Sequence, residues 1–438
     1  MRIVVFDLDG TLYQTRISLI QAFRSTLCEL GLPPVDEDEL CRHLGSTTET
    51  ILKAVLPEGS DFAQFQFVLK GYEKQAIHSI GLLFPGTKEM LSALIKKGYT
   101  LTICSNGGEE HIRDVLKATG IESFFDGIRS AKNYRSKGDA VKSLLSAGDE
   151  AVLIGDTHYD FEAAKANQIP SIAAAYGYGM EPDLREATFS VSSAEGIIGA
   201  VIQIEVYREI ADRLLDQKRC RIIGINGVDT AGKTEFTARF SRYLEAVGHR
   251  NTVLTIDDFH NHSDVRKMGP DEITAYEQNA FDYRKIIQEV LEPLTEHGSL
   301  DTVVTCLNLE TDMYEKKMHL IIHPDNTLLL EGVLLFREPL KKYFEGKIFL
   351  YIPFDEVLSR ARDRDLPRFG DDVIDKYRRK YIPVQKRYLQ EWNPMRTSDM
   401  VVDNQLFEAP FIMNSEQINQ ACSRMIDQPD LGEQFAEC

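Results

Sequence analysis

The feature that most constrains the fold is a glycine-rich segment near the middle of the chain, residues 221–234. It begins with an apolar run that we interpret as a buried strand, and this run breaks at Gly227. The loop that follows has the spacing Gly-x-x-x-x-Gly-Lys-Thr and ends in Gly232, Lys233 and Thr234. A helical pattern comes next, with apolar residues about a turn apart. Strand, glycine loop and helix in this order predict a phosphate-binding loop.

The chemistry expected of this loop depends on each of its parts. Glycines let the backbone curl, so that its N–H groups converge on phosphate oxygens. The helix N-terminus adds a partial positive charge, Lys233 reaches the β- and γ-phosphates, and Thr234 binds Mg²⁺. A chance glycine turn before a helix is the alternative. The three parts together instead predict binding of a nucleoside triphosphate, with ATP and Mg²⁺ as the cofactors.

Composition limits the kinds of protein that this chain can be. Its 438 residues are enough for two or three domains, and 43% apolar and 27% charged residues are ordinary for globular proteins. No apolar run approaches membrane-spanning length, and the acid at Asp7 comes too early for a signal peptide. Seven scattered cysteines without a Cys-x-x-Cys pair favour reduced thiols in the cytoplasm. A formal net charge of −18 disfavours nucleic acid, so we expect small-molecule partners.

Two carboxylates follow the first apolar run of the chain. The run Arg2–Phe6 reads as a buried strand, and Asp7, Asp9 and a Gly-Thr pair come directly after it. Asp7 can attack a phosphoryl group, and Asp9 can protonate the leaving oxygen. A divalent ion would neutralise the carboxylates so that a phosphate can approach. For this segment alone, a turn with solvated acids is the alternative.

Further segments supply the other groups that such a reaction needs. One strand-like run ends at Ser105 and Asn106, where the hydroxyl can bond the phosphoryl group and the amide can contact substrate. Lys137 supplies a cation. Another strand-like run ends before Asp156 and Asp160, whose carboxylates suit Mg²⁺, a hard cation that prefers oxygen ligands. The C-terminal ends of strands are where open α/β sheets bind ligands.

This ordered set resembles the haloacid dehalogenase-like phosphatases over about residues 1–200. The resemblance implies that Asp7 is the nucleophile and Asp9 the acid/base. It also implies that Ser105 and Lys137 contact the phosphoryl group. The Mg²⁺ ligands that we expect are Asp7, Asp9 through its carbonyl, Asp156 and Asp160.

Residues 14–83, between the first two motifs, carry several short helical patterns punctuated by proline and glycine. An all-helical insertion here looks like the small cap of phosphoglycolate phosphatase-like members of that family. Such a cap closes over a small phosphorylated substrate and shuts out water, and it would obstruct a polymer.

The second half of the chain offers its own set of catalytic candidates. A strand over 252–256 ends at Asp257, which can take the proton of an acceptor hydroxyl, although a helix cap is the alternative. A buried strand delivers Glu331 to the Mg²⁺ site. Ten basic and five acidic residues lie between Arg360 and Arg387. Arg360 and Arg364 could clamp a polyphosphate there, with a solvated helix face as the alternative.

These segments resemble the uridine kinase-like branch of the P-loop kinases over about residues 218–410. By that resemblance Asp257 is the base, Asp282 holds a ribose hydroxyl, and the lid residues include Arg364 and the substrate contact Arg378. Uridine kinases carry a Tyr-Asp-Phe segment where this chain has Leu307-Asn308-Leu309. The missing acid leaves the identity of the acceptor open.

We therefore expect an α/β protein of two domains. Residues 1–204 form a Rossmann-like haloacid dehalogenase core with a helical cap, and residues 205–438 form a P-loop kinase with a parallel sheet and a helical lid. The predicted function is bifunctional: hydrolysis of a small phosphomonoester, and ATP-dependent phosphorylation of a nucleoside or sugar-like hydroxyl. The alternatives are end repair by a polynucleotide kinase-phosphatase and a nucleotide-sensing regulator whose kinase half only binds.

Overall fold

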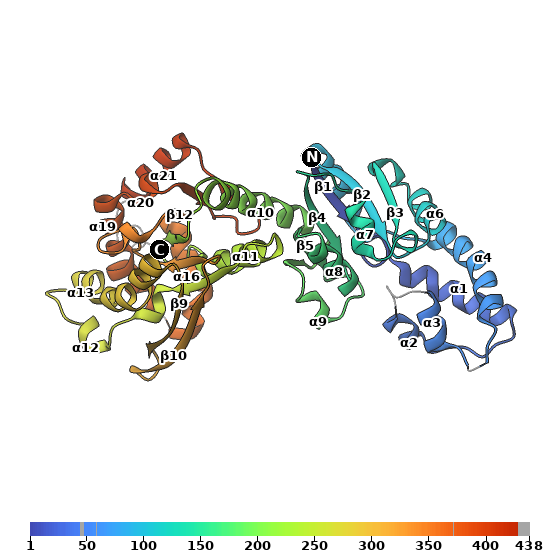
Figure 1. Cartoon of the computed structure of the whole chain (residues 1–438), viewed down its shortest axis with the longest axis horizontal. Helices are drawn as coiled ribbons and strands as arrows, with labels where there is room; N and C mark the ends of the chain where they lie inside the picture. Colours follow the sequence, from blue (N-terminus) through green and yellow to red (C-terminus); the bar gives the residue numbers. More distant parts are fainter. Residues whose placement is uncertain (44–47, 58, 371, 428–438) are drawn as a thin grey trace, which may run out of the picture. The chain divides into compact units, whose positions relative to one another are not determined.

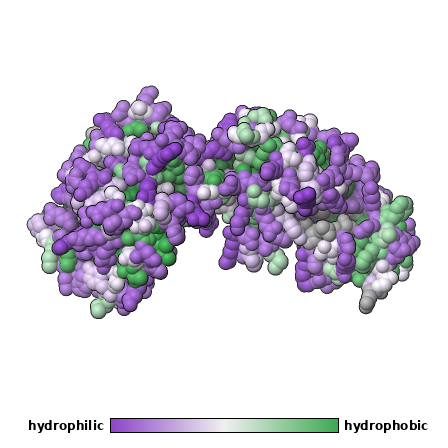
Figure 2. All heavy atoms as spheres, in the orientation of Figure 1, coloured by the Kyte–Doolittle hydropathy of each residue, from purple (hydrophilic) through white to green (hydrophobic). Residues whose placement is uncertain are grey.

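The computed structural model describes residues 1–43, 48–57, 59–370 and 372–427. They fall into two compact units, Met1–Ile204 and Glu205–Cys438, and the division lies within helix α10 (Gly196–Ala211). Figure 1 shows a sheet flanked by helices in each unit. Polar residues cover most of the surface seen in Figure 2, in keeping with the formal charge of −18. No helix in the described ranges is both long enough and apolar enough to cross a membrane.

The sheet of the N-terminal unit has six parallel strands in the order β3-β2-β1-β4-β5-β6. Their bounds are β1 Arg2–Phe6, β2 Thr100–Ser105, β3 Gly127–Ser130, β4 Glu150–Gly155, β5 Ser171–Ala174 and β6 Phe189–Val191. Phe6 at the end of β1 is level with Ile103 on β2 and Ile154 on β4. The residues that follow these three strands therefore emerge at one edge of the sheet, as predicted.

Helices connect the strands and cover the sheet. They are α5 Thr87–Lys96, α6 Glu109–Thr119, α7 Lys137–Lys142, α8 His158–Ala166 and α9 Glu181–Leu184. The strands between them are β-branched and apolar, and Val4, Val5 and Leu153 are fully buried. Burial on both faces is what a parallel sheet between helices requires, so the predicted α/β core with a parallel sheet is confirmed for this unit.

The insertion after β1 is all-helical in the described residues. Its helices are α1 Thr15–Glu29, α2 Glu37–Arg42, α3 Thr48–Val55 and α4 Phe62–Ile80. Phe23 and Phe65 pack against each other in its own small core, with ring centroids 5.4 Å apart. The two chain segments that join it to the sheet run side by side, because Tyr13 forms a bridge to Leu83. We call this insertion the cap.

The C-terminal unit contains a second six-stranded sheet, in the order β14-β13-β12-β7-β11-β8. The strands are β7 Ile222–Gly227, β8 Asn251–Thr255, β11 Thr327–Gly332, β12 Gly346–Tyr351, β13 Met400–Asp403 and β14 Phe411–Ile412. All neighbours are parallel except β14, which is antiparallel to β13. A separate antiparallel hairpin consists of β9 (Leu300–Asn308) and β10 (Met313–Ile322).

The helices of this unit are mostly short. They are α11 Lys233–Ala246, α12 Ser263–Arg266, α13 Glu272–Asn279, α14 Tyr283–Ile286, α15 Glu292–His297, α16 Phe354–Arg364, α17 Leu366–Phe369, α18 Asp372–Lys376, α19 Ile382–Trp392, α20 Pro394–Thr397 and α21 Ser415–Asp427. A π-helical segment, η7 (Tyr377–Tyr381), joins α18 to α19.

One predicted strand ends earlier than expected. β8 stops at Thr255, and residues Ile256–Phe259 form a 3₁₀ turn, η4, so Asp257 lies in a turn and not on a strand. Thr255 begins the turn, because its hydroxyl accepts a hydrogen bond of 3.3 Å from the Asp257 backbone N–H. Side chains in a 3₁₀ turn point in directions about a third of a revolution apart. The rule that successive side chains of a strand point to opposite faces of the sheet therefore does not apply to Asp257.

Candidate active sites

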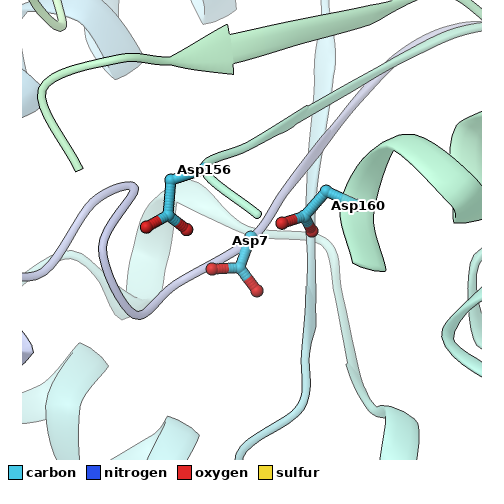
Figure 3. A group of neighbouring side chains, drawn as sticks. All are labelled: Asp7, Asp156 and Asp160. Carbon is cyan, nitrogen blue, oxygen red and sulfur yellow. The ribbon is translucent and has the colours of Figure 1, made fainter. Parts of the chain in front are cut away.

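Three buried carboxylates meet at the C-terminal edge of the first sheet (Figure 3). Asp7 follows β1, Asp156 follows β4, and Asp160 lies in the first turn of α8. One oxygen from each lies within 4.8 Å of the others, and all three residues are buried. The predicted Mg²⁺ ligands Asp7, Asp156 and Asp160 are thus brought together.

A buried lysine, Lys137, faces this group. Lys137 begins α7, and its Nζ lies 2.5 Å from Asp7 Oδ1 and 2.6 Å from Asp160 Oδ1. Burial by itself would lower the pKa of Lys137, but the carboxylates of Asp160 and Asp7 raise it above its usual value. One ammonium against three carboxylates leaves the cluster with excess negative charge.

The pKa values of two of the carboxyl groups are raised. Burial raises the pKa of Asp7 well above its usual value, although Lys137 opposes this. Burial, followed by repulsion from Asp160, raises the pKa of Asp156 to about 7. Carboxylate oxygens suit a hard divalent cation, so Asp156 and the Asp7 oxygen that Lys137 does not contact, Oδ2, fit Mg²⁺. Asp160 is less available to a cation, since its Oδ2 already accepts hydrogen bonds from the Thr157 N–H (3.1 Å) and hydroxyl (2.9 Å).

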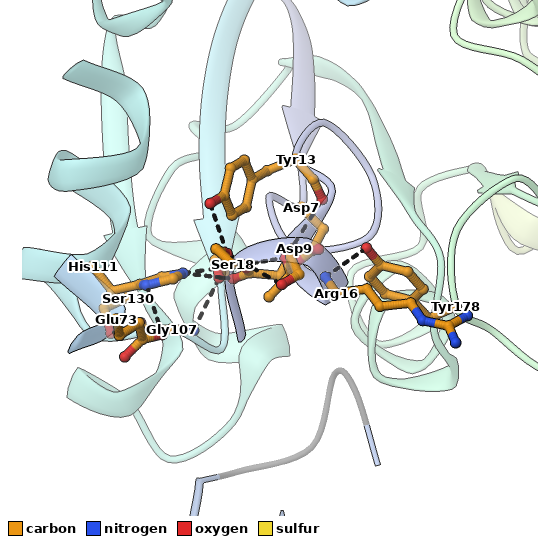
Figure 4. Close-up of polar contacts among 12 residues, drawn as sticks. Asp7, Asp9, Tyr13, Arg16, Ser18, Glu73, Gly107, His111, Ser130 and Tyr178 are labelled. Carbon is orange, nitrogen blue, oxygen red and sulfur yellow. Dashed lines mark hydrogen bonds and ion pairs between the residues drawn. The ribbon is translucent and has the colours of Figure 1, made fainter. Parts of the chain in front are cut away.

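Asp9 lies beside this cluster in a different environment (Figure 4). Its carboxylate accepts a hydrogen bond of 2.7 Å from the Thr15 hydroxyl, and His111 Nε2 lies 3.0 Å from its Oδ1. The Ser105 hydroxyl lies 3.4 Å from Asp9 Oδ2. Burial alone would raise the pKa of Asp9, but the charge of His111 and these hydrogen bonds bring it below its usual value. The pKa values of Asp7 and Asp9 are therefore shifted in opposite directions although the two residues are two positions apart.

Sequence reasoning missed His111 and its partner Glu73. His111 Nδ1 lies 3.2 Å from Glu73 Oε1 on the cap helix α4, so an ion pair joins the cap to the Asp9 carboxylate. Burial alone would lower the pKa of His111, but Asp9 and Glu73 raise it well above 6.5. The available signal was the position of His111 in the first turn of α6, the helix that follows Ser105.

A cavity of about 130 Å³ opens onto these groups. Asp7, Asp9, Ser105 and Asn106 line it on the side of the sheet, so the predicted substrate contact Asn106 faces it. Lys132, which sequence reasoning also missed, lines it as well. The cap contributes Leu19, Phe23, Ile51, Leu69 and Glu73. The cavity thus combines a charged floor with a mainly apolar roof.

In the C-terminal unit, the glycine loop joins β7 to α11 as predicted from its sequence. Gly232 has a φ of +81°, a conformation that glycine adopts easily, and it is the N-cap of α11. A Cβ at Gly227 would lie 2.8 Å from the Leu350 carbonyl oxygen, so this position accepts only glycine without a shift. Lys233 Nζ donates to the Val228 carbonyl oxygen at 2.8 Å, and the Thr234 hydroxyl donates to Glu331 Oε1 at 3.1 Å.

A larger cavity, of about 1090 Å³, extends from this loop. Glu331 on β11 is in register with Ile225 on β7 and Thr255 on β8, which brings it beside the loop. The predicted residues that line this cavity are Gly232, Lys233, Thr234, Asp257, Glu331, Arg360 and Arg364. The predicted phosphate-binding residues Lys233 and Thr234 and the proposed base Asp257 therefore line the same cavity.

The adjacent acids Asp257 and Asp258 point to different surroundings. Asp257 lines the cavity, whereas Asp258 pairs with Lys316 on β10, with 2.5 Å between Oδ1 and Nζ. Of the two, only Asp257 is in a position to meet a ligand in that cavity.

Two predicted substrate contacts do not line the cavity. Asp282 is the N-cap of α14, where its side chain accepts a hydrogen bond of 3.0 Å from the Lys285 backbone N–H. Arg378 lies 3.5 Å from Asp375, and Arg379 and Lys380 line the cavity instead. Arg378 lies in the π-helical segment η7, whose wider turn presents different residues from the α-helix that we assumed.

The predicted clamp arginines reach the cavity with most of their donors already engaged. Arg360 donates to the carbonyl oxygens of Asn404 and Gln405, at 2.8 Å each, and to Glu356. Arg364 makes a bidentate pair with Asp365, at 2.8 and 2.9 Å. These hydrogen bonds hold the Arg360 side chain against the wall of the cavity beside the phosphate loop.

Comparison with known proteins separates the two units. The family model described as haloacid dehalogenase-like hydrolase matches residues 4–174. A phosphoglycolate phosphatase of Aquifex aeolicus is 30% identical over 186 residues, which cover 41% of this chain and 86% of that protein. A phosphoglycolate phosphatase of Agrobacterium fabrum is 26% identical over 202 residues, covering 42% of this chain and 86% of that protein.

A solved structure described as a possible uridine kinase from Bacillus stearothermophilus is 21% identical to this chain. The match covers 44% of this chain and 97% of that one, with a TM-score of 0.36. A TM-score this low carries no weight for the function of the C-terminal unit.

Proposed function

Because this chain belongs, through residues 4–174, to the haloacid dehalogenase-like hydrolases, we propose that its N-terminal unit is a phosphatase. The substrate is a small phosphomonoester, and the intermediate is an aspartyl-phosphate on Asp7. The observation that carries this proposal is the convergence of Asp7, Asp9 and Ser105 on one small cavity beneath the cap, with Lys137 and Asp156 against Asp7.

The chemistry follows from the contacts of each group. Lys137 holds Asp7 Oδ1, so we assign the attack on phosphorus to Oδ2. The ester bond breaks as Asp9 donates a proton to the leaving oxygen, and Asp9 then takes a proton from the water that cleaves the aspartyl-phosphate. Bound Mg²⁺, held by Asp7, Asp156 and the Asp9 carbonyl, would neutralise the carboxylates so that an anionic phosphate can approach.

The cavity limits the size of the substrate. About 130 Å³ beneath an apolar roof suits a phosphorylated metabolite of a few carbons, and the relatives named phosphoglycolate phosphatases make 2-phosphoglycolate the first compound to test. The experiment is a phosphate-release screen over small phosphomonoesters, with Asp7→Asn as the control. Preference for oligonucleotide 3′-phosphates over every small compound would overturn this proposal.

We propose a second function, an ATP-dependent kinase, for the C-terminal unit. The observation that favours it is the shared cavity of Lys233, Thr234, Glu331 and Asp257. In this proposal Lys233 binds the β- and γ-phosphates, and Thr234 with Glu331 binds Mg²⁺. The carboxylate of Asp257 accepts the proton of a small hydroxyl acceptor as the acceptor oxygen attacks the γ-phosphorus, the bond to the β,γ-bridging oxygen breaks, and ADP leaves.

Two measurements test the kinase proposal. The full chain should bind Mg·ATP, and Lys233→Ala should abolish ATP-dependent transfer while phosphate release from the N-terminal unit continues. Efficient phosphorylation of a 5′-hydroxyl oligonucleotide would favour nucleic-acid end repair, and ATP binding without any transfer would favour a sensor.

A further inference from the structure

Five cations from two segments of the chain line the cavity in the C-terminal unit. Two come from α12 and its C-terminal end, and three come from α18 and η7. They are Arg266, Lys267, Lys376, Arg379 and Lys380, which we call the basic cluster.

Carboxylates within the protein only partly neutralise the basic cluster. Arg266 pairs with Asp312 at 3.1 Å, and Arg379 lies 3.8 Å from Glu272 on the surface. Among the residues that the structure describes, no carboxylate forms an ion pair with Lys267, Lys376 or Lys380.

The pKa of the half-buried Lys380 is shifted in the direction expected from repulsion between the cations. Burial, followed by the charge of Lys376, lowers the pKa of Lys380; the Glu272 carboxylate opposes this, and Arg266 and Arg379 act in the same direction as Lys376. Lys267, Lys376 and Arg379 are exposed, so solvent screens the repulsion least at the partly buried Arg266 and Lys380, where a bound anion would relieve it.

Lys380 of the basic cluster lies next to an aromatic residue that also lines the cavity, Tyr276. Lys380 Nζ is 4.9 Å from the centroid of the Tyr276 ring. Burial, followed by the carboxylates of Asp229 on the phosphate loop and of Asp257, raises the pKa of Tyr276, so Tyr276 lies within electrostatic range of both the loop and the proposed base. Arg266 lies on the segment that leads directly from Asp257 into α12.

The phosphate-loop side has cations of its own. Lys233 is at the start of α11, and Arg364 lines the cavity from α16. The basic cluster comes in addition to these two cations. Several cations from two separate segments can grip a phosphate dianion from more than one side, since its three terminal oxygens each accept charge-assisted hydrogen bonds.

Resting on the proposed kinase function, we propose that the hydroxyl acceptor carries a phosphate group of its own, which the basic cluster binds. The acceptor would then be a phosphorylated sugar-like compound or a nucleoside monophosphate, and not a neutral nucleoside. In the transfer, a bond forms between the acceptor oxygen and the γ-phosphorus as the γ-phosphorus bond to the β,γ-bridging oxygen breaks. The hydroxyl proton passes to Asp257, ADP leaves, and the phosphate held by the cluster is unchanged. The product carries two separate phosphate groups.

The test uses the full chain with Asp7→Asn, which prevents the N-terminal unit from hydrolysing the acceptors. ATP-dependent transfer is measured for matched neutral and phosphorylated compounds: glycerol and glycerol 3-phosphate, ribose and ribose 5-phosphate, uridine and uridine monophosphate. Gluconate adds a carboxylate without phosphate. The sugar and nucleotide pairs distinguish the two sources of phosphate.

We expect the phosphorylated member of at least one pair to have a kcat/KM at least 10-fold above that of its neutral partner. The double variant Lys376→Ala/Lys380→Ala should raise the KM for that acceptor by at least 10-fold, with the affinity for Mg·ATP unchanged. Lys317→Ala, which removes an exposed lysine of β10, is the matched control and should change neither value. Fluorescence of Trp392, the only tryptophan, checks that the unit is folded.

Four results would contradict the inference or its premise. Equal or better use of a neutral member, or of gluconate, would overturn the inference and leave the kinase function standing. ATP binding with no transfer to any phosphorylated compound would overturn it too. An equal loss of Mg·ATP affinity in the double variant would assign the basic cluster to the nucleotide. Failure of the parent chain to bind Mg·ATP would refute the kinase function itself.

Discussion

Replacing Lys137 by methionine should destabilise the N-terminal unit and reveal how its carboxylate cluster is balanced. The Lys137 side chain is 5% exposed, and its partners Asp7 and Asp160 are 7% and 0% exposed, so solvent screens these ion pairs little. Removing one partner from a buried ion pair leaves an uncompensated charge and costs about 3–5 kcal/mol. We expect a loss of this size in the free energy of unfolding at pH 8 without Mg²⁺.

The loss should depend on pH in a definite direction. Burial already raises the pKa of Asp7 and of Asp156, and loss of the ammonium raises these pKa values further. An acid whose pKa is higher in the folded than in the unfolded state binds more protons when folded, so stability falls as pH rises through that range. The variant should therefore be closest to the wild type near pH 5 and furthest from it at pH 8. Saturating Mg²⁺ should recover part of the loss.

Hydrogen exchange measured by mass spectrometry in increasing urea, followed on peptides from β1 and β4, gives the free energy of unfolding of this unit alone. Trp392 fluorescence follows the C-terminal unit and should not change. Lys142→Met, at an exposed position on the same helix, is the matched control. A loss below about 1 kcal/mol, or one that is equal at pH 5 and pH 8, would refute this account of the cluster.

Four further outcomes are expected. Asp7→Asn should abolish phosphate release and leave ATP binding unchanged, because an amide cannot attack phosphorus; turnover above a few per cent of wild type would exclude Asp7 as the nucleophile. Asp257→Asn should lower phosphoryl transfer by about 10²–10⁴-fold without changing ATP affinity, as measured by steady-state kinetics. Asp258→Asn should be much milder because Asp258 pairs with Lys316, and the reverse order would mean that Asp258 is the base. Mg²⁺ affinity, measured by calorimetry in the N-terminal unit, should fall as pH drops below about 7, because protons then compete for Asp156; equal affinity at pH 6 and pH 8 would contradict its role as a ligand.

Local sequence patterns determined a large part of this protein. The apolar run before Asp7 predicted β1, and the run before Gly227 predicted β7, because buried parallel strands are short, continuous and apolar. The helical patterns within residues 14–83 predicted an all-helical insertion, of which α4 (Phe62–Ile80) is one helix, since an amphipathic period repeats along one element. Register then brought Asp7 and Asp156 together, because the C-terminal ends of parallel strands share one edge. The roles of these residues in catalysis stay predictions.

Tertiary structure decided what depends on packing between distant segments. His111 reaches Asp9 across 102 positions in the chain, and Glu73 reaches His111 only because the cap lies over the sheet edge. Asp258 turns to Lys316 on the hairpin, a contact with no local signature. The π-helical segment η7, which the sequence pattern did not predict, places Lys380 along the cavity and Arg378 away from it. Local patterns specify where an element starts and which side of it is apolar. The partner of a polar side chain depends on how elements pack, and that is set by the sum of many contacts across the whole unit.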